Sequence, residues 1–80
     1  MPKVRRSELP EALLRHLLRR VREREIAPDQ IILLAQWLDT LPEVPAGHWF
    51  NKFPGMTVCG EGELIKTFLQ PGQLPNGEEI

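Results

Sequence analysis

The side chains that could act as nucleophiles, acids or bases are few, and most lie in the second half of the sequence. They are His16, His48, Cys59, Glu61, Glu63, Lys66 and Thr67. A catalytic cysteine needs a lowered thiol pKa, which a helix N-terminus or a neighbouring cation supplies. The sequence around Cys59 offers neither. We therefore expect Cys59 to lie inside a strand, since free cysteine is among the most buried residue types.

Metal-binding and phosphate-binding motifs are absent from this sequence. Glu61 and Glu63 share a glycine-containing stretch and could bind a cation, but they lack the array of Asp and Asn residues that makes a calcium loop. The pair Gly60 and Gly62 is not followed by a helix, so it does not form an anion-binding loop. The single cysteine excludes an internal disulfide and a multi-cysteine zinc site. We predict no metal site and no cofactor.

A group of basic side chains falls on one predicted helix near the N-terminus. If Leu14 marks the centre of the buried stripe, a helical rotation of about 100° per residue places four basic residues on the opposite, solvated side. These are Arg15, His16, Arg19 and Arg20. Such a surface could bind phosphates or an acidic protein partner. It could equally be a solvated helix face whose arginine stems cover apolar edges.

An aromatic segment in the middle of the chain is the second candidate binding surface. Trp49, Phe50 and Phe53 lie close together, with Lys52 between them. Aromatic side chains interleaved with a cation can stack on bases or anchor a protein partner. The alternative is that these rings belong to the core, because a domain this small needs its large apolar side chains for stability.

Two helices should position the basic surface. Leucines spaced three and four residues apart predict a helix over residues 7–25, with Ser7 as its cap. A second helix is predicted over 28–40, because Pro28 suits a first turn and Pro42 closes the segment. The connector is short, so we expect an αα-hairpin.

The rest of the chain is predicted to be extended. Residues 42–55 are broken by prolines and glycines, and 56–69 read as a β-hairpin with its loop at residues 60–63. An isolated hairpin is marginal in water, so residues 48–53 could supply a third antiparallel strand. Residues 70–80 are predicted to be a loose tail. The predicted fold class is α+β, in one small domain spanning 1–80.

Composition and charge restrict the functional classes. Apolar residues make up 41% of the 80 residues and charged residues 26%, which is typical of a globular protein. The longest apolar run has five residues, too few for a membrane span, and the first 25 residues are too charged for a secretory signal. We therefore expect no membrane contact and a cytoplasmic location. Residues 1–24 hold eight basic and three acidic residues, whereas 25–80 hold two basic and eight acidic ones. This asymmetry suggests an acidic partner, a nucleic acid or self-association.

The segment from Gly62 to Phe68 resembles the last hairpin strand of small toxin ribonucleases of the RelE/barnase-like group. The resemblance implies RNA cleavage, with His48 and Lys66 as the acid–base and phosphate-stabilising groups and Thr67 beside them.

Two functions remain open at this point. The first is a non-enzymatic protein-interaction or regulatory module that binds a protein partner or forms a homodimer. The alternative is an RNA-directed protein, either an RNA binder or a toxin-type ribonuclease.

Overall fold

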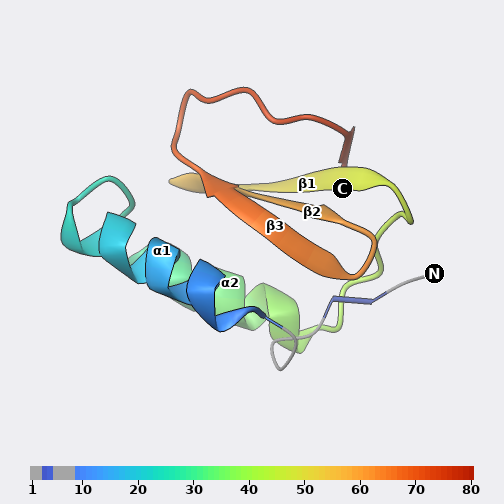
Figure 1. Ribbon diagram of the computed structural model, residues 1–80, viewed down its shortest axis with the longest axis horizontal. Helices are drawn as coiled ribbons and strands as arrows, with labels where there is room; N and C mark the ends of the chain where they lie inside the picture. The colour runs from blue at the N-terminus through green and yellow to red at the C-terminus, as the bar shows by residue number, and fades with distance from the viewer. Residues whose placement is uncertain (1–2, 5–8) are drawn as a thin grey trace.

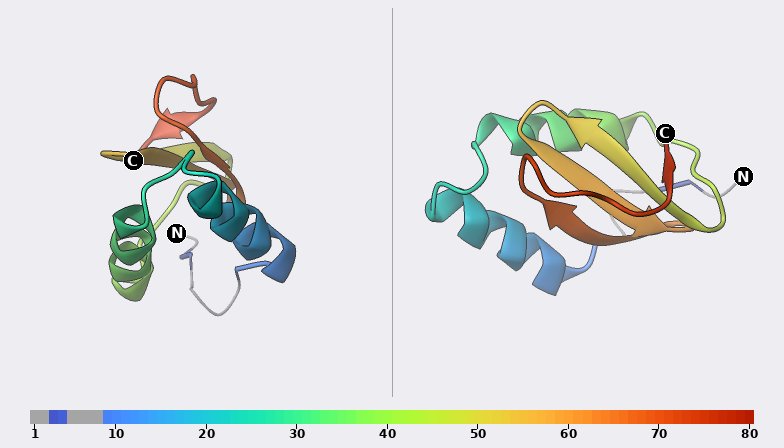
Figure 2. Two further views of the ribbon diagram at one scale, coloured as in Figure 1. Left: turned by 90° about the vertical axis from the view of Figure 1, so that its left-hand side faces the viewer. Right: turned by 90° about the horizontal axis from the view of Figure 1, so that it is seen from above.

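Helices precede strands in this chain, and both helices lie on the same face of one sheet (Figure 1, Figure 2). The structure is a computed structural model that describes residues 3–4 and 9–80. The helices are α1 (Glu11–Arg22) and α2 (Asp29–Asp39), and the strands are β1 (His48–Phe53), β2 (Met56–Glu61), β3 (Leu64–Leu69) and β4 (Glu78–Glu79). The predicted α+β class and the helix-then-strand order are confirmed.

The helices are shorter than the sequence predicted. The residue that precedes α1 is Pro10, which has extended backbone and forms no side-chain cap; the predicted cap, Ser7, lies outside the described residues. The helix ends at Arg22, and the positive φ of 64° at Arg24 is incompatible with a right-handed helix. The bounds of α2 differ from the prediction by one residue at each end. No described helix is long and apolar enough to cross a bilayer.

The sheet has the strand order β3-β2-β1-β4. The pairs β1–β2 and β2–β3 are antiparallel, and β1 is the third strand that residues 48–53 were expected to supply. The predicted loop at 60–63 is too long, because Gly60 and Glu61 continue β2 and pair with Trp49 and His48. The turn between β2 and β3 therefore consists of two residues, Gly62 and Glu63.

The prediction of a loose tail is wrong at its end. Residues 70–77 arch over the sheet face that points away from the helices, and β4 then pairs in parallel with β1 (Figure 1). The N–H of Ile80 donates to the carbonyl of Phe50 at 2.9 Å. This pairing satisfies backbone groups that would otherwise remain open along the edge of β1.

The core lies between the helices and the sheet. Its buried members are Val4, Leu17, Ile26, Leu34, Leu38, Val44, Trp49, Met56, Val58, Ile65 and Phe68. The centroid of the Trp37 ring is 5.8 Å from that of Trp49 and 6.0 Å from that of Phe53, which it meets edge-on. Gln30 joins α2 to the sheet, because its side-chain oxygen accepts the N–H of Gly55 at 2.9 Å.

Candidate functional site

The buried side of α1 is centred on Leu17, not on Leu14. Leu17 is fully buried, whereas 37% of Leu14 and 46% of Leu18 are exposed. Leu13 and Val21 are half-buried against the core. The predicted apolar stripe is therefore buried or half-buried at Leu13, Leu17 and Val21 but exposed at Leu14 and Leu18. Its predicted centre is wrong, and the helix presents different side chains to solvent than the sequence predicted.

Two of the predicted basic residues are exposed as expected. Arg15 pairs with Glu11 at 3.1 Å, and Arg19 pairs with Glu23 at 3.2 Å, each one helical turn apart. Exposed pairs of this kind contribute little stability and exchange readily with solvent. The guanidinium groups of Arg15 and Arg19 are thus accessible to a partner.

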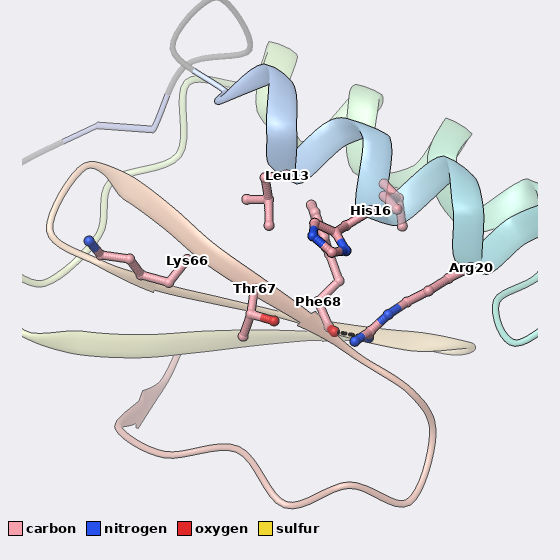
Figure 3. A pocket seen from close by; sticks show the side chains of 7 residues that line it. Leu13, His16, Arg20, Lys66, Thr67 and Phe68 are labelled. Atoms are coloured by element: carbon pink, nitrogen blue, oxygen red, sulfur yellow. Dashed lines mark hydrogen bonds between the residues drawn. The ribbon is translucent and has the colours of Figure 1, made fainter.

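The other two basic residues turn toward the sheet. Arg20 is half-buried and donates from Nη1 to the carbonyl of Phe68 in β3, so its predicted position on the solvated side is wrong. His16 is exposed but lines the same cavity as Arg20, a space of about 250 Å³ between α1 and β3 (Figure 3). The shifted centre of the helix explains both positions, because it rotates these side chains toward β3.

An apolar groove runs between α1 and α2. Its volume is about 250 Å³, and its lining residues are Leu9, Leu14, Leu17, Ile31, Leu34, Ala35 and Leu38. All seven are apolar. The sequence did not predict this groove. A signal was present, because the leucine stripe of α1 is too wide to be covered by one neighbouring element.

A third cavity lies on the sheet face away from the helices. It measures about 310 Å³ and is lined by His48, Cys59, Gly60, Glu61, Lys66, Thr67, Leu69, Leu74, Pro75 and Asn76. The fold therefore brings together the three residues that the ribonuclease resemblance implied. A carboxylate accompanies them, because Oε2 of Glu61 is 3.7 Å from Nε2 of His48.

Cys59 lines this cavity from β2 and is half-buried. Burial raises the pKa of the Cys59 thiol above its ordinary value. The thiol is therefore protonated near neutral pH and is a poor nucleophile.

The aromatic segment contributes mainly to the interior. Trp49 is fully buried, and its Nε1 donates to the carbonyl of Gly62 at 2.8 Å. Phe50 is 9% exposed, and Phe53 is half-buried beside Trp37. Trp49 and Phe50 thus offer no accessible ring. Trp49 lies in the core, as the alternative stated, whereas Phe50 is buried on the sheet face that points away from the helices.

Known proteins give no guide to this site. Comparisons with protein families, with curated proteins and with solved structures found no match to this chain. Within residues 3–4 and 9–80, no group of three or more His, Cys, Asp or Glu side chains is placed to hold a metal ion. The groove and the two polar cavities are therefore the features of this chain that bear on its function.

Proposed function

We propose that this chain is a protein-interaction module that binds an acidic, amphipathic helix of a partner protein in the groove between α1 and α2. The observation that carries this proposal is an apolar groove that is open at the surface and bordered by arginines. A lone cysteine suits a reducing compartment, so we propose that the module acts in the cytoplasm.

The apolar character of the groove supports a protein partner. Leu14 lines the groove and Leu18 lies one turn further along α1, and both are substantially exposed. Burying one leucine side chain contributes about 1.5–3 kcal/mol. A groove between two helices suits a third helix, which would insert apolar side chains spaced three and four residues apart.

The charge along the groove supports an acidic partner. Three arginines and one acid surround Leu18 on α1, namely Arg15, Arg19, Arg22 and Glu23. The sequence of α2 has no charged residue between Asp29 and Asp39. The groove therefore has one positive border and one neutral border. Carboxylates along one edge of a partner helix would complement the positive border, which raises the association rate and sets the orientation.

The same charges disfavour a second copy of this chain as the occupant. A two-fold symmetric interface uses one patch twice, so it would bring two arginine-rich borders to one interface. Like charges brought together at an interface destabilise it. A foreign acidic helix avoids this repulsion.

The first test is a titration with a designed helix, followed by amide NMR shifts. The probe is a synthetic amphipathic peptide of about 18 residues, with a leucine stripe and glutamates along one edge. We expect saturable shifts at Leu14, Leu18, Ile31 and Ala35. A peptide with lysines in place of the glutamates should bind at least about tenfold more weakly, because it meets the arginine border with like charge. Equal binding of the two peptides, or shifts confined to the sheet, would contradict the proposal.

Matched variants locate the binding surface. Leu14→Gln should weaken peptide binding by about tenfold, since it removes one apolar side chain from the groove lining. The control is Ile32→Gln, because Ile32 is 59% exposed on α2 and does not line the groove. If Ile32→Gln weakens binding as much as Leu14→Gln does, the groove is not the docking surface.

We also propose an RNA-directed activity as a second candidate. It is supported by the convergence of His48, Lys66 and Thr67 on one cavity, with Glu61 close to His48. A carboxylate–imidazole pair can transfer a proton, and a lysine can stabilise negative charge that develops on a phosphate. Here Glu61 would act as the base, His48 as the acid, and Lys66 as the electrostatic group.

Incubation with total cellular RNA at about 50 mM salt tests this second candidate, because electrostatic association is strong under that condition. We expect cleavage that is lost in His48→Ala and in Lys66→Ala. Arg15→Ala is the control for general loss of positive charge. Intact RNA together with no measurable binding would exclude this activity.

A further inference from the structure

The cavity between α1 and β3 gathers positive charge that its own walls do not neutralise. It is lined by Leu13, His16, Leu17, Arg20, Lys66, Thr67 and Phe68, and none of these described residues is acidic. Figure 3 shows His16 and Arg20 extending from α1 toward β3, whereas the Thr67 side chain lies on the far side of that strand. Thr67 pairs with Cys59 and shares its sheet face, which points away from the helices. The imidazole of His16 and the guanidinium of Arg20 thus meet the backbone of β3 in one space of about 250 Å³.

Arg20 is fixed in this cavity. Its Nη1 donates to the carbonyl of Phe68, which holds the guanidinium group against β3. A guanidinium has five N–H donors, and a bond to a neutral carbonyl leaves its charge uncompensated. Burying part of a charge is costly unless an opposite charge accompanies it. An anion in the cavity would therefore stabilise the half-buried Arg20.

A β-bulge shapes the strand side of the cavity. Cys59 pairs with Thr67 and Gly60 pairs with Ile65, so Lys66 has no partner on β2. The extra residue places Lys66 at the cavity rim, which is how bulges redirect side chains. Figure 3 shows the Lys66 ammonium group pointing away from His16 and Arg20. Lys66 thus adds positive charge near the rim rather than a fixed donor.

We propose that this cavity binds the phosphate group of a small phosphate monoester or of inorganic phosphate. A phosphate presents oxygens in several directions, and it can accept bonds from the Arg20 fork and the His16 ring at once. The cavity is smaller than the roughly 300–1,000 Å³ of pockets that enclose drug-sized ligands. It therefore fits the phosphate group and leaves the remainder of a monoester outside.

This inference goes beyond the proposed docking function. The groove uses Leu14 and its neighbours on the side of α1 that faces α2, whereas the phosphate cavity uses His16 and Arg20 on the side that faces β3. Each site can be disabled by its own substitutions.

Amide NMR titrations with inorganic phosphate and, separately, with adenosine monophosphate test the proposal at about 50 mM sodium chloride, where screening is moderate. We expect saturable shifts at His16, Arg20 and Thr67 with both ligands. Equal affinities would identify the phosphate group alone as the recognised part, and a higher affinity for the monoester would show that its remainder also contacts the protein. The absence of saturable shifts, or binding seen only with an RNA oligonucleotide, would overturn the proposal.

Arg20→Gln should weaken phosphate binding by about tenfold, because it removes the charge and the fork. The matched control is Arg19→Gln, which removes the same charge from an exposed position outside the cavity. We expect the control to change affinity less than about twofold. Equal losses in the two variants would indicate diffuse attraction to a basic surface and would overturn the proposed site.

A second variant keeps the test decisive if Arg20→Gln unfolds the chain. His16→Ala leaves the bond between Arg20 and Phe68 in place, and it should weaken binding by about threefold or more through the lost ring donor. Unchanged affinity in a folded His16→Ala protein would overturn the assignment of His16 and with it the cavity. Leu14→Gln, which disables the groove, should leave phosphate binding intact, so failure of one proposal is distinguishable from failure of the other.

Discussion

Gly60 determines where the largest core side chain can lie. It pairs with Trp49 across the β1–β2 ladder, and a Cβ atom at this position would lie 2.3 Å from Cζ2 of Trp49. The same Cβ would be 2.6 Å from the carbonyl oxygen of Leu64. Neither neighbour can move freely, because the indole is fully buried and the carbonyl belongs to the backbone. The absence of a side chain at residue 60 therefore makes room for Trp49.

Gly60→Ala should destabilise the protein by about 1–3 kcal/mol or more, as expected when a methyl group is forced into a packed core. The free energy of unfolding from urea denaturation measures this loss. The control is Gly47→Ala, because a Cβ at Gly47 meets nothing within 4 Å. Equal stability of the two variants would show that Trp49 does not pack as described.

Cys59 should react slowly in the folded protein. Burial raises the pKa of its thiol above 9.0, so the folded chain holds the proton at a pH where the unfolded chain begins to release it. At a pH below the thiol pKa of the unfolded chain, this difference does not change the free energy of unfolding. As the pH rises above that value, the unfolded chain loses its proton first, so the free energy of unfolding falls. Labelling with a thiol reagent at about pH 8 should be slower for the native protein than for the chain in urea. Equal rates in the two states would contradict the burial of Cys59.

At the scale of elements, α1 has three different sides. Leu17 faces the core, Leu14 faces the groove, and Arg20 faces β3. A single amphipathic helix can serve three neighbours because each residue is rotated by about 100° from the one before, so Leu14, Leu17 and Arg20 follow one another around the axis in steps of about 60°. The docking groove and the phosphate cavity therefore both depend on the rotation of this one helix.

Two adjacent leucines test that rotation. Leu17→Ala should lower the free energy of unfolding by about 2–5 kcal/mol, because it leaves a cavity in the core. Leu18→Ala should change it by about 0.5 kcal/mol or less, as is usual for a largely exposed position. Urea denaturation of both variants measures the difference. A larger loss for Leu18→Ala would mean that α1 is rotated relative to this structure.

At the scale of the whole molecule, charges of opposite sign lie on opposite sides of the sheet. The basic helix α1 lies on one face, and the tail that leads to Glu78 and Glu79 passes over the other (Figure 1, Figure 2). Contact between the basic helix of one copy and the acidic tail of another would be a head-to-tail contact. Such contacts use two different surfaces, and they close into a ring only when the rotation between copies permits it. Exposed ion pairs are also weak and are screened by salt.

We therefore expect a mass of 9.2 kDa in sedimentation at about 150 mM salt, independent of protein concentration. Association should increase only when the salt is lowered. If the mass is twice as large and returns to the monomer value in Leu14→Gln, a second copy fills the groove. That result would contradict a foreign acidic helix as the occupant.

The sequence by itself determined the fold class and most of the strands. Helical spacing of leucines, prolines near the ends of α2 and the glycine-containing loop within 56–69 are local signals, and local backbone preferences follow from them. The sequence offered burial of Trp49 as one of two alternatives, because a small domain needs its large apolar side chains for stability. These features depend on near neighbours along the chain.

The tertiary structure alone decided which side of each element meets which neighbour. Periodicity predicts that α1 has an apolar stripe, but contacts with α2 and β3 select Leu17 as its centre and turn Arg20 inward. The spacing of Ile65 and Phe68, three residues apart, conflicts with strand alternation and could have signalled the bulge at Lys66. Pairing of β4 with β1 has no local signal, because residues far apart in sequence satisfy each other's backbone groups only after the chain has folded.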